Sequence, residues 1–334
     1  MVSHFLVGIV SLMNRNEGVI FMEKFEQIFK YINDHAETIV AQEEQDYLEA
    51  LLQTLEETLD GKFEWQVEGA TKEDMRKAIQ IAILKGMRKS AQPNHQMTPD
   101  TLGLIVSHFV ERCFEQELTE RSISIVDPAL GTGNLLFTLM NAFEGKVEAT
   151  GVEVDDVLIR LAAATGDLVE QPVTLFRQDA LEKLLVDPVD AVVCDLPVGY
   201  YPNEEVALDY ELCAAEGMSY SHHLFIEQSL NYTKEGGFAF FLVPSNLFES
   251  DQAKQLHQYI KGHAWIQAVI QLPENLFASK AHEKSILILQ KQSTQLKAPR
   301  EVLLAKVPNM SNREALAMFF EKVRMWKESN NQKR

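Results

Sequence analysis

Between residues 122 and 291 the chain alternates short apolar segments, rich in β-branched and aromatic residues, with segments of helical periodicity. The expected strands are 122–127, 146–155, 173–179, 190–195, 236–244, 264–272 and 284–291. Strands that alternate with helices predict an α/β fold with a doubly wound, mostly parallel sheet, here of seven strands. The last two expected strands have no helix between them, so we expect one of them to run antiparallel.

Acidic residues stand at or just before the ends of four consecutive expected strands. They are Asp127, Glu153, Asp179 and Asp195. Each one alone is typical of a loop or of a helix N-cap. The carboxyl ends of parallel strands, however, meet at one edge of the sheet, where α/β proteins bind their ligands. Four carboxylates in succession therefore predict a ligand site at that edge.

A glycine-containing loop, DPALGTGN, connects the first expected strand to the helix that follows it. Gly131 and Gly133 let a ligand approach the backbone closely. Ala129 and Asn134 belong to the same loop and are expected to contact the ligand. Glu153 lies 22 residues after Gly131, a spacing suited to binding ribose hydroxyls. The loop and the acidic residue together predict a site for a cofactor that contains a nucleoside.

Two cofactors are compatible with such a loop. A nicotinamide dinucleotide is one, but Leu136 occupies the position of the third glycine, and the charge of Asp127 would repel a pyrophosphate. S-adenosylmethionine is the other and fits better, because Asp127 would attract its positively charged amino-acid end. Asp179 would then accept a hydrogen bond from the adenine amino group, and Asp195 completes the predicted cofactor site.

Several segments resemble, in order, the motifs of the amino-group (N6-adenine type) DNA methyltransferases, and most closely those of the modification subunits of type I restriction systems. They are NHQMTP before the glycine loop, DPALGTGNLL, DAVVCDLPVGYYP at the fourth expected strand, YTKEGGFAFFLVPSNLF and LPENLFASKAHEKSILIL. The resemblance covers about residues 95–290. It implies a class I S-adenosylmethionine-dependent methyltransferase fold, and it adds Gln96, Thr98 and Pro99 to the predicted cofactor pocket.

The resemblance also implies direct methyl transfer to an exocyclic amine, whose lone pair is delocalised into its ring. By the family's pattern, the Asp195 side chain and the Leu196 backbone carbonyl, held by Pro197, would accept the two N–H bonds and make the nitrogen more nucleophilic. The aromatic residue of the pattern would stack on a base flipped out of the duplex. The activity implied is N-methylation of adenine in DNA.

The chain departs from that pattern at two positions. Leu196 stands where the pattern has its first proline, and Val198 stands where it has the aromatic residue. Tyr200 or Tyr201 is expected to supply the ring instead. The departures leave two alternatives open, namely the same chemistry on RNA or on a protein amide, and a non-catalytic role through a protein partner.

The part of the chain before the sheet is predicted to be helical, because leucines recur at helical spacing. The expected organisation is a disordered N-terminal extension at 1–21, a helical domain at 22–92 and a methyltransferase domain at 93–334. Six basic residues of the helical domain form either a solvated helix face or a contact for the DNA backbone. They are Lys72, Arg76, Lys77, Lys85, Arg88 and Lys89.

The net charge is −18 at pH 7, which argues against a protein that grips nucleic acid over most of its surface. Binding to DNA is therefore expected to be weak for the chain alone. The resemblance implies a protein partner that supplies target recognition. No apolar run reaches the roughly 18 residues of a membrane span. Three cysteines without metal-site spacing fit a reducing compartment, so we predict a cytoplasmic protein without a metal.

Overall fold

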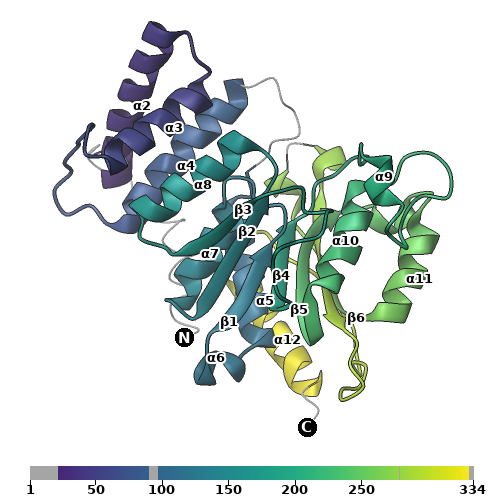
Figure 1. Ribbon diagram of the computed structural model, residues 1–334. Helices are drawn as coiled ribbons and strands as arrows, with labels where there is room; N and C mark the ends of the chain where they lie inside the picture. The colour runs from purple at the N-terminus through teal and green to yellow at the C-terminus, as the bar shows by residue number, and fades with distance from the viewer. Residues whose placement is uncertain (1–21, 90–96, 278, 331–334) are drawn as a thin grey trace.

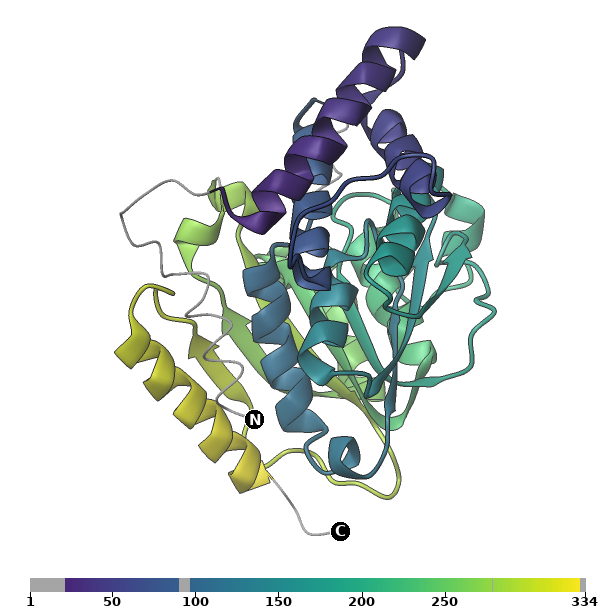
Figure 2. The ribbon, with the colours of Figure 1, turned by 90° about the vertical axis from the view of Figure 1, so that its left-hand side faces the viewer.

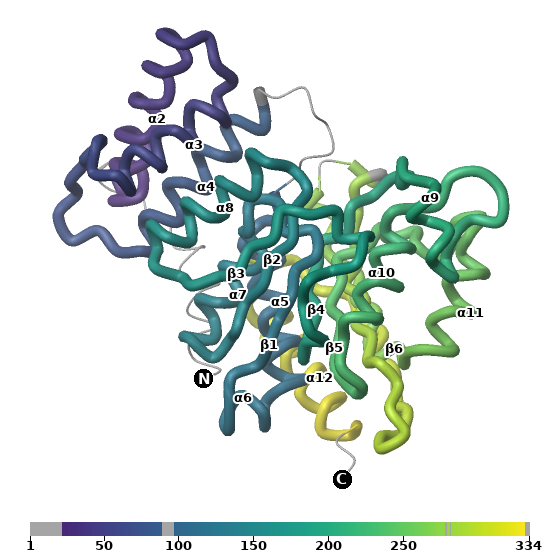
Figure 3. The backbone as a smooth tube through the Cα atoms, in the orientation of Figure 1, coloured from purple at the N-terminus to yellow at the C-terminus, as the bar shows by residue number. Residues whose placement is uncertain are grey.

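A twisted sheet forms the centre of the protein, and the computed structural model describes residues 22–89, 97–277 and 279–330 around it (Figures 1 and 3). Within these residues the sheet has eight strands in the order β3-β2-β1-β4-β5-β7-β6-β8. They are β1 Ile123–Asp127, β2 Val147–Glu153, β3 Val173–Arg177, β4 Val189–Asp195, β5 Thr233–Pro244, β6 Ala264–Gln271, β7 Lys284–Lys291 and β8 Leu303–Lys306. All seven expected strands are present, and the predicted fold class is confirmed.

The pairing of the strands follows the expected pattern. Strands β1 to β5 pair in parallel, whereas β7 lies antiparallel between β5 and β6. The eighth strand, which the sequence analysis did not predict, is four residues long and pairs in parallel with β6 at the sheet edge. The antiparallel direction of β7 brings its first residue, Lys284, beside Pro244 at the end of β5.

Helices cover both faces of the sheet. Successive residues of a strand point to opposite sides, so each central strand contributes apolar side chains to a core on each face. Ile125 of β1 packs in the core shared with α5, α7 and α12, and Val126 packs in the core shared with α10 and α11. Figure 2 shows α5 and α12 side by side over the first face. The bounds are α5 Asp100–Cys113, α6 Glu117–Glu120, α7 Asn134–Phe143, α8 Asp156–Leu168, α9 Glu204–Ala207, α10 Ser221–Asn231, α11 Ala253–His263, α12 Arg313–Asn330, and the 3-10 turns η1 Leu247–Glu249, η2 Glu274–Leu276 and η3 Lys280–His282.

One helix boundary differs from the expectation by one residue. The sequence suggests Thr98 as the N-cap of α5 and Pro99 as its first residue, whereas Pro99 itself occupies the N-cap and the helix begins at Asp100. The extended backbone of Pro99 leaves Thr98 outside the helix, where its side chain can reach the sheet edge. None of the described helices is long and apolar enough to cross a membrane.

The N-terminal helical region shares its apolar core with one helix of the sheet domain, α8 (Figure 1). Helices α2 Lys24–Glu43, α3 Tyr47–Leu59 and α4 Lys72–Lys89 enclose a core that includes Ile28, Leu51 and Ile79. Leu161 and Ala164 of α8 belong to the same core. Because this core contains residues of α8, it couples the helical region to the sheet domain. The limits of the helical domain, 22–92, remain a prediction. The predicted extension, 1–21, lies outside the described residues.

The described basic residues of α4 do not form one basic surface, which corrects the interpretation of the set as a solvated face or a DNA contact; the side chain of Lys89 lies outside the described part. Arg76 is only 4% exposed and pairs with acidic side chains inside the protein. Lys72 pairs with Glu170 at 2.5 Å, and Lys85 pairs with Glu37 at 2.5 Å. Arg88 is exposed. Carboxylates of this chain therefore neutralise much of the charge expected to face DNA or solvent, and of these pairs only Arg76–Asp100 is largely buried.

We expect Leu55→Ala in α3 to lower the free energy of unfolding by about 2–5 kcal/mol, because Leu55 is fully buried in the core shared with α8. Leu59→Ala, on the same helix but 43% exposed, is the matched control and should change it by less than about 0.5 kcal/mol. Urea unfolding followed by far-UV circular dichroism and by tryptophan fluorescence measures both. Two separate transitions, of which Leu55→Ala moves only one, would show that the helical region unfolds independently.

Candidate cofactor and active site

A cavity of about 680 Å³ opens at the carboxyl ends of β1, β2 and β4. The structure brings ten residues of the predicted site to its wall, namely Thr98, Asp127, Ala129, Gly131, Asn134, Glu153, Asp179, Asp195, Pro197 and Tyr201. Pro99, Gly133 and Tyr200 lie outside the described lining. Gln96 lies outside the residues that the structure describes. The expectation that the strand ends share one site therefore matches the geometry.

The glycine loop is held in place by Glu153. The backbone N–H of Gly131 donates to Glu153 Oε2 at 2.8 Å, and the N–H groups of Val154 and Asp155 donate to Oε1 at 2.9 Å each. The Glu153 carboxylate is thus fixed at the cavity wall, and its Oε2 keeps a lone pair for a ligand hydroxyl.

The turn of the loop before α7 requires glycine at position 133. Gly133 has φ +81° at the N-cap of α7, and a Cβ there would lie 2.6 Å from the Phe137 ring.

Asp127 is a buried carboxyl in the wall of the cavity. It is 1% exposed and accepts one backbone hydrogen bond, from Ala129 at 3.1 Å. Burial raises the pKa of Asp127 to about 7, and the negative charges of Asp195 and Glu153 add to the shift. A carboxyl that ionises with difficulty gains strongly from a nearby cation. This position therefore suits the positively charged amino-acid end of S-adenosylmethionine.

Asp179 and Tyr201 form a pair on the same wall. The Tyr201 hydroxyl donates to Asp179 Oδ2 at 2.7 Å, and the Leu181 N–H donates to Oδ1 at 3.0 Å. Burial raises the pKa of Tyr201, and its hydrogen bond to Asp179 raises it further. Since Tyr201 is only 6% exposed and is tied to a carboxylate of the predicted cofactor site, its ring belongs to the cofactor side of the cavity.

Asp195, at the end of β4, is held from two sides. Thr98 Oγ1 donates to Asp195 Oδ2 at 2.9 Å, and the Lys284 ammonium contacts Oδ1. The side chains of Asp195 and Lys284 are 14% and 16% exposed. The next residue, Leu196, donates its N–H to Leu242 of β5 at 3.1 Å, and no described donor reaches its carbonyl oxygen. A fixed carboxylate and an open carbonyl therefore follow one another at the cavity.

Two exposed side chains follow this carboxylate along the chain. Val198 lines the cavity and is 51% exposed. Tyr200 is 55% exposed, and its ring stacks on Tyr220 with centroids 4.9 Å apart and planes 15° apart. The backbones of the two tyrosines also form an isolated β-bridge. Tyr200 is therefore presented to solvent as a fixed ring.

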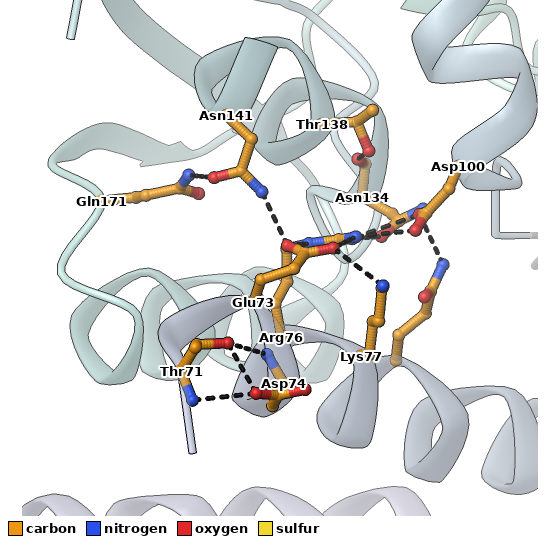
Figure 4. Close-up of polar contacts among 11 residues, drawn as sticks. Thr71, Glu73, Asp74, Arg76, Lys77, Asp100, Asn134, Thr138, Asn141 and Gln171 are labelled. Atoms are coloured by element: carbon orange, nitrogen blue, oxygen red, sulfur yellow. Dashed lines mark hydrogen bonds and ion pairs between the residues drawn. The ribbon is translucent and has the colours of Figure 1, made fainter. Parts of the chain in front are cut away.

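A buried arginine of the helical region, Arg76, contacts the start of α5 and the start of α7, next to the cavity (Figure 4). Arg76 pairs with Asp100 at 2.6 Å and donates to Asn134 Oδ1 at 3.0 Å. Asn134 Nδ2 in turn donates to the Thr98 carbonyl at 2.6 Å and to Asp100 at 2.9 Å. Glu73 pairs with Arg76 at 2.8 Å. These contacts tie α4, the start of α5 and the start of α7 to one guanidinium.

Neither Lys284 nor the buried position of Arg76 was expected from the sequence pattern. For Lys284 the signal was available, because an antiparallel strand places its first residue, not its last, at the ligand edge. For Arg76 the nearby Glu73 suggests only an exposed helical pair, and the partners that place it inside the protein, Asp100 and Asn134, are 24 and 58 residues away in the sequence.

Comparison with known proteins agrees with this geometry. Residues 88–330 match the N-6 DNA methylase family. The chain belongs to that family. The match includes the glycine loop, all strands of the sheet and every described residue of the predicted site.

Relatives support the same conclusion. The chain is 47% identical over 243 residues to the uncharacterized protein YtxK of Bacillus subtilis, covering 72% of this chain and 73% of YtxK. A crystal structure described as a class I S-adenosylmethionine-dependent methyltransferase from Listeria monocytogenes is 40% identical, has a TM-score of 0.85, and covers 91% of this chain and 99% of that chain. The methyltransferase subunit of a type I restriction-modification system from Streptococcus thermophilus has a TM-score of 0.63 at 16% identity, covering 92% and 74%, and shows the fold alone. Family and fold together support methyltransferase activity and the use of S-adenosylmethionine.

We expect Arg76→Met to lower the free energy of unfolding by about 3–5 kcal/mol, because it leaves Asp100 and Glu73 without their buried cation. Arg76→Lys should recover only part of the loss, since an ammonium lacks the planar fork that reaches several acceptors. The neighbouring Lys77→Met removes a 3.7 Å contact of a partly exposed side chain and should cost less than about 1 kcal/mol. Urea unfolding compares the three variants, and equal effects of Arg76→Met and Lys77→Met would contradict the positioning role.

Asp127→Asn should stabilise the ligand-free protein at pH 8 but not at pH 4. The pKa of Asp127 is about 7 in the folded protein, above its ordinary value of 3.8, so its contribution to stability is complete below pH 4 and is lost as the pH rises through 7. The variant should gain about 2–4 kcal/mol over wild type across that range. Thermal unfolding from pH 4 to pH 8 measures the difference, with the exposed Asp209→Asn as control. A difference that does not change with pH would be inconsistent with this titration.

Proposed function

We propose that the protein transfers a methyl group from S-adenosylmethionine to the exocyclic amino group of adenine in DNA. The observation that carries the proposal is the position of Asp195 and of the open Leu196 carbonyl at the cavity that also holds Asp127, Glu153 and Asp179. This arrangement combines two acceptors for an amino group with a set of carboxylates suited to the cofactor.

The cofactor would lie along the ends of β1, β2 and β3. Asp127 would bind the ammonium of its amino-acid end, Glu153 a ribose hydroxyl, and Asp179 the adenine amino group. Thr98, Ala129, Gly131 and Asn134 line the same cavity and would contact the bound molecule. When bound, S-adenosylmethionine supplies a methyl group on a positively charged sulfur. Gly133 contributes through the turn that opens α7, and Gln96 and Pro99 remain members of the proposed site by the resemblance alone.

The acceptor would be activated at the end of β4. An exocyclic amine is a weak nucleophile because its lone pair is delocalised into the ring. The Asp195 carboxylate and the Leu196 carbonyl would accept its two N–H bonds, which favours a tetrahedral nitrogen and fixes its direction of attack. Pro197 restricts the backbone conformation of Leu196, whose carbonyl is the second acceptor. These groups hold and orient the amine, and their positions are set before it binds.

Tyr200 is the better candidate for the stacking ring. Tyr201 is buried and its hydroxyl is bonded to Asp179, whereas Tyr200 is half exposed and supported from behind by Tyr220. A planar base extruded toward Asp195 would pass the ring of Tyr200 at the mouth. Base–aromatic stacking is worth about 1–3 kcal/mol per base. We therefore assign base contact to Tyr200 and support of the cofactor side to Tyr201.

Recognition of the target is proposed to come from a protein partner. The net charge is −18, and the basic residues of α4 are largely paired with carboxylates. Both features disfavour tight binding to DNA by the chain alone.

The test incubates the protein with S-adenosylmethionine labelled in its methyl group and with DNA, RNA and protein fractions from cells. We expect label in DNA, recovered as N6-methyladenine by mass spectrometry, and none with Asp195→Ala. Tyr200→Ala should lower the transfer rate by about 10- to 100-fold. Adding Val198→Phe to Tyr200→Ala should restore part of it, because a ring then returns to the family's position. Leu208→Ala, 74% exposed, is the surface control.

The other outcomes have distinct meanings. Label in RNA or in protein would replace DNA as the acceptor while keeping the chemistry of Asp195. Cofactor binding without transfer to any fraction would indicate a non-catalytic role through a partner. A wild-type protein that binds neither S-adenosylmethionine nor its demethylated product in calorimetry would overturn the proposed function itself.

A further inference from the structure

We propose that Lys284 determines the specificity of the cofactor site for charge: by neutralising Asp195, it weakens the preference for the positively charged S-adenosylmethionine over its uncharged demethylated product, S-adenosylhomocysteine. The proposal rests on the proposed function, because it assumes that this cavity binds the cofactor. It concerns a residue outside the glycine loop and outside the Asp-Leu-Pro-Val segment.

Lys284 is the only lysine or arginine among the described residues that line the cavity. Five carboxylates line the same wall, and they are Asp127, Glu153, Asp179, Asp195 and Glu283. The antiparallel pairing of β7 with β5 brings Lys284 beside Pro244, and its ammonium contacts Asp195 Oδ1. One cation therefore stands at one particular carboxylate of an otherwise acidic site.

The pair is fixed and largely shielded from water. Thr98 Oγ1 donates to the second oxygen of Asp195 at 2.9 Å, which hinders rotation of the carboxylate away from Lys284. Both side chains are less than one-fifth exposed, at 14% and 16%. Charges act strongly on a ligand where water does not screen them. Asp195 paired in this way presents its oxygens as hydrogen-bond acceptors, while its charge is offset by the ammonium.

The two forms of the cofactor respond differently to this offset. They share the adenosine and the amino-acid end and differ by one methyl group and one positive charge on sulfur. An unpaired Asp195 would attract the charged form and leave the uncharged form nearly unaffected. An unpaired Lys284 would repel the charged form. Removing the charge of Lys284 and removing the charge of Asp195 should therefore change the ratio of the two affinities in opposite directions. A loss of packing at either position would not produce opposite changes.

The experiment measures the dissociation constants of both compounds by calorimetry and uses their ratio as the readout. Lys284→Met should shift the ratio toward S-adenosylmethionine by about tenfold, the scale of one close charge at intermediate dielectric. Asp195→Asn should shift it the other way by a similar factor. The double variant, which has neither charge, should return the ratio to near that of wild type. Lys284→Arg keeps the charge and should keep the ratio.

Lys280→Met is the matched control, since Lys280 is an exposed lysine of the same connection and lies outside the described lining of the cavity. A wild type that binds both compounds, with the same ratio in Lys284→Met and Asp195→Asn, would overturn this inference and leave the cofactor site intact. A wild type that binds neither compound would overturn the proposed function instead. If Lys284→Met fails to fold, Lys284→Gln and Asp195→Asn decide the question, because their shifts must still be opposite in sign.

Discussion

The ion pair between Arg76 and Asp100 is the interaction on which the geometry of the site depends. The guanidinium lies inside the protein and holds Asp100 at the start of α5 and Asn134 at the start of α7. Asn134 then fixes the carbonyl of Thr98, whose hydroxyl bonds Asp195. A continuous chain of hydrogen bonds thus leads from the helical region to the carboxylate at the end of β4. Because buried polar groups lose much when one partner is removed, these contacts favour one arrangement of the cavity wall.

This connection changes what the helical region does. Its basic residues suggest a surface for DNA. In the structure, however, Arg76 is buried and binds the starts of α5 and α7, and Lys72 and Lys85 pair with carboxylates. Its apolar core includes Leu161 of α8, so packing and polar contacts attach the helices to the sheet at two separate places. The region is thus a structural support of the cavity.

The fold and most of the proposed site could be predicted from sequence because both depend on local pattern. Alternating segments predict the strands, and parallel strands bring their ends to one edge, so Asp127, Glu153 and Asp195 meet in the cavity. The same rule overlooks Lys284, which begins an antiparallel strand and reaches that edge from the opposite direction. The burial of Arg76 could not be predicted, because its partner Asp100 is 24 residues away in the sequence and burial of a charge depends on tertiary structure.

The two departures from the family's pattern have different physical consequences. In the proposed reaction the acceptor at the first position is a backbone carbonyl, which leucine supplies as well as proline does. Leu196 also has an N–H, which proline lacks, and this group bonds Leu242 of β5 and extends the sheet pairing by one residue. Sheet pairing therefore replaces the ring as the means of fixing the carbonyl. At Val198 no backbone property can replace an aromatic face, so the proposed reaction needs a ring from another side chain, and Tyr200, stacked on Tyr220, has the exposure and the rigidity that this role requires.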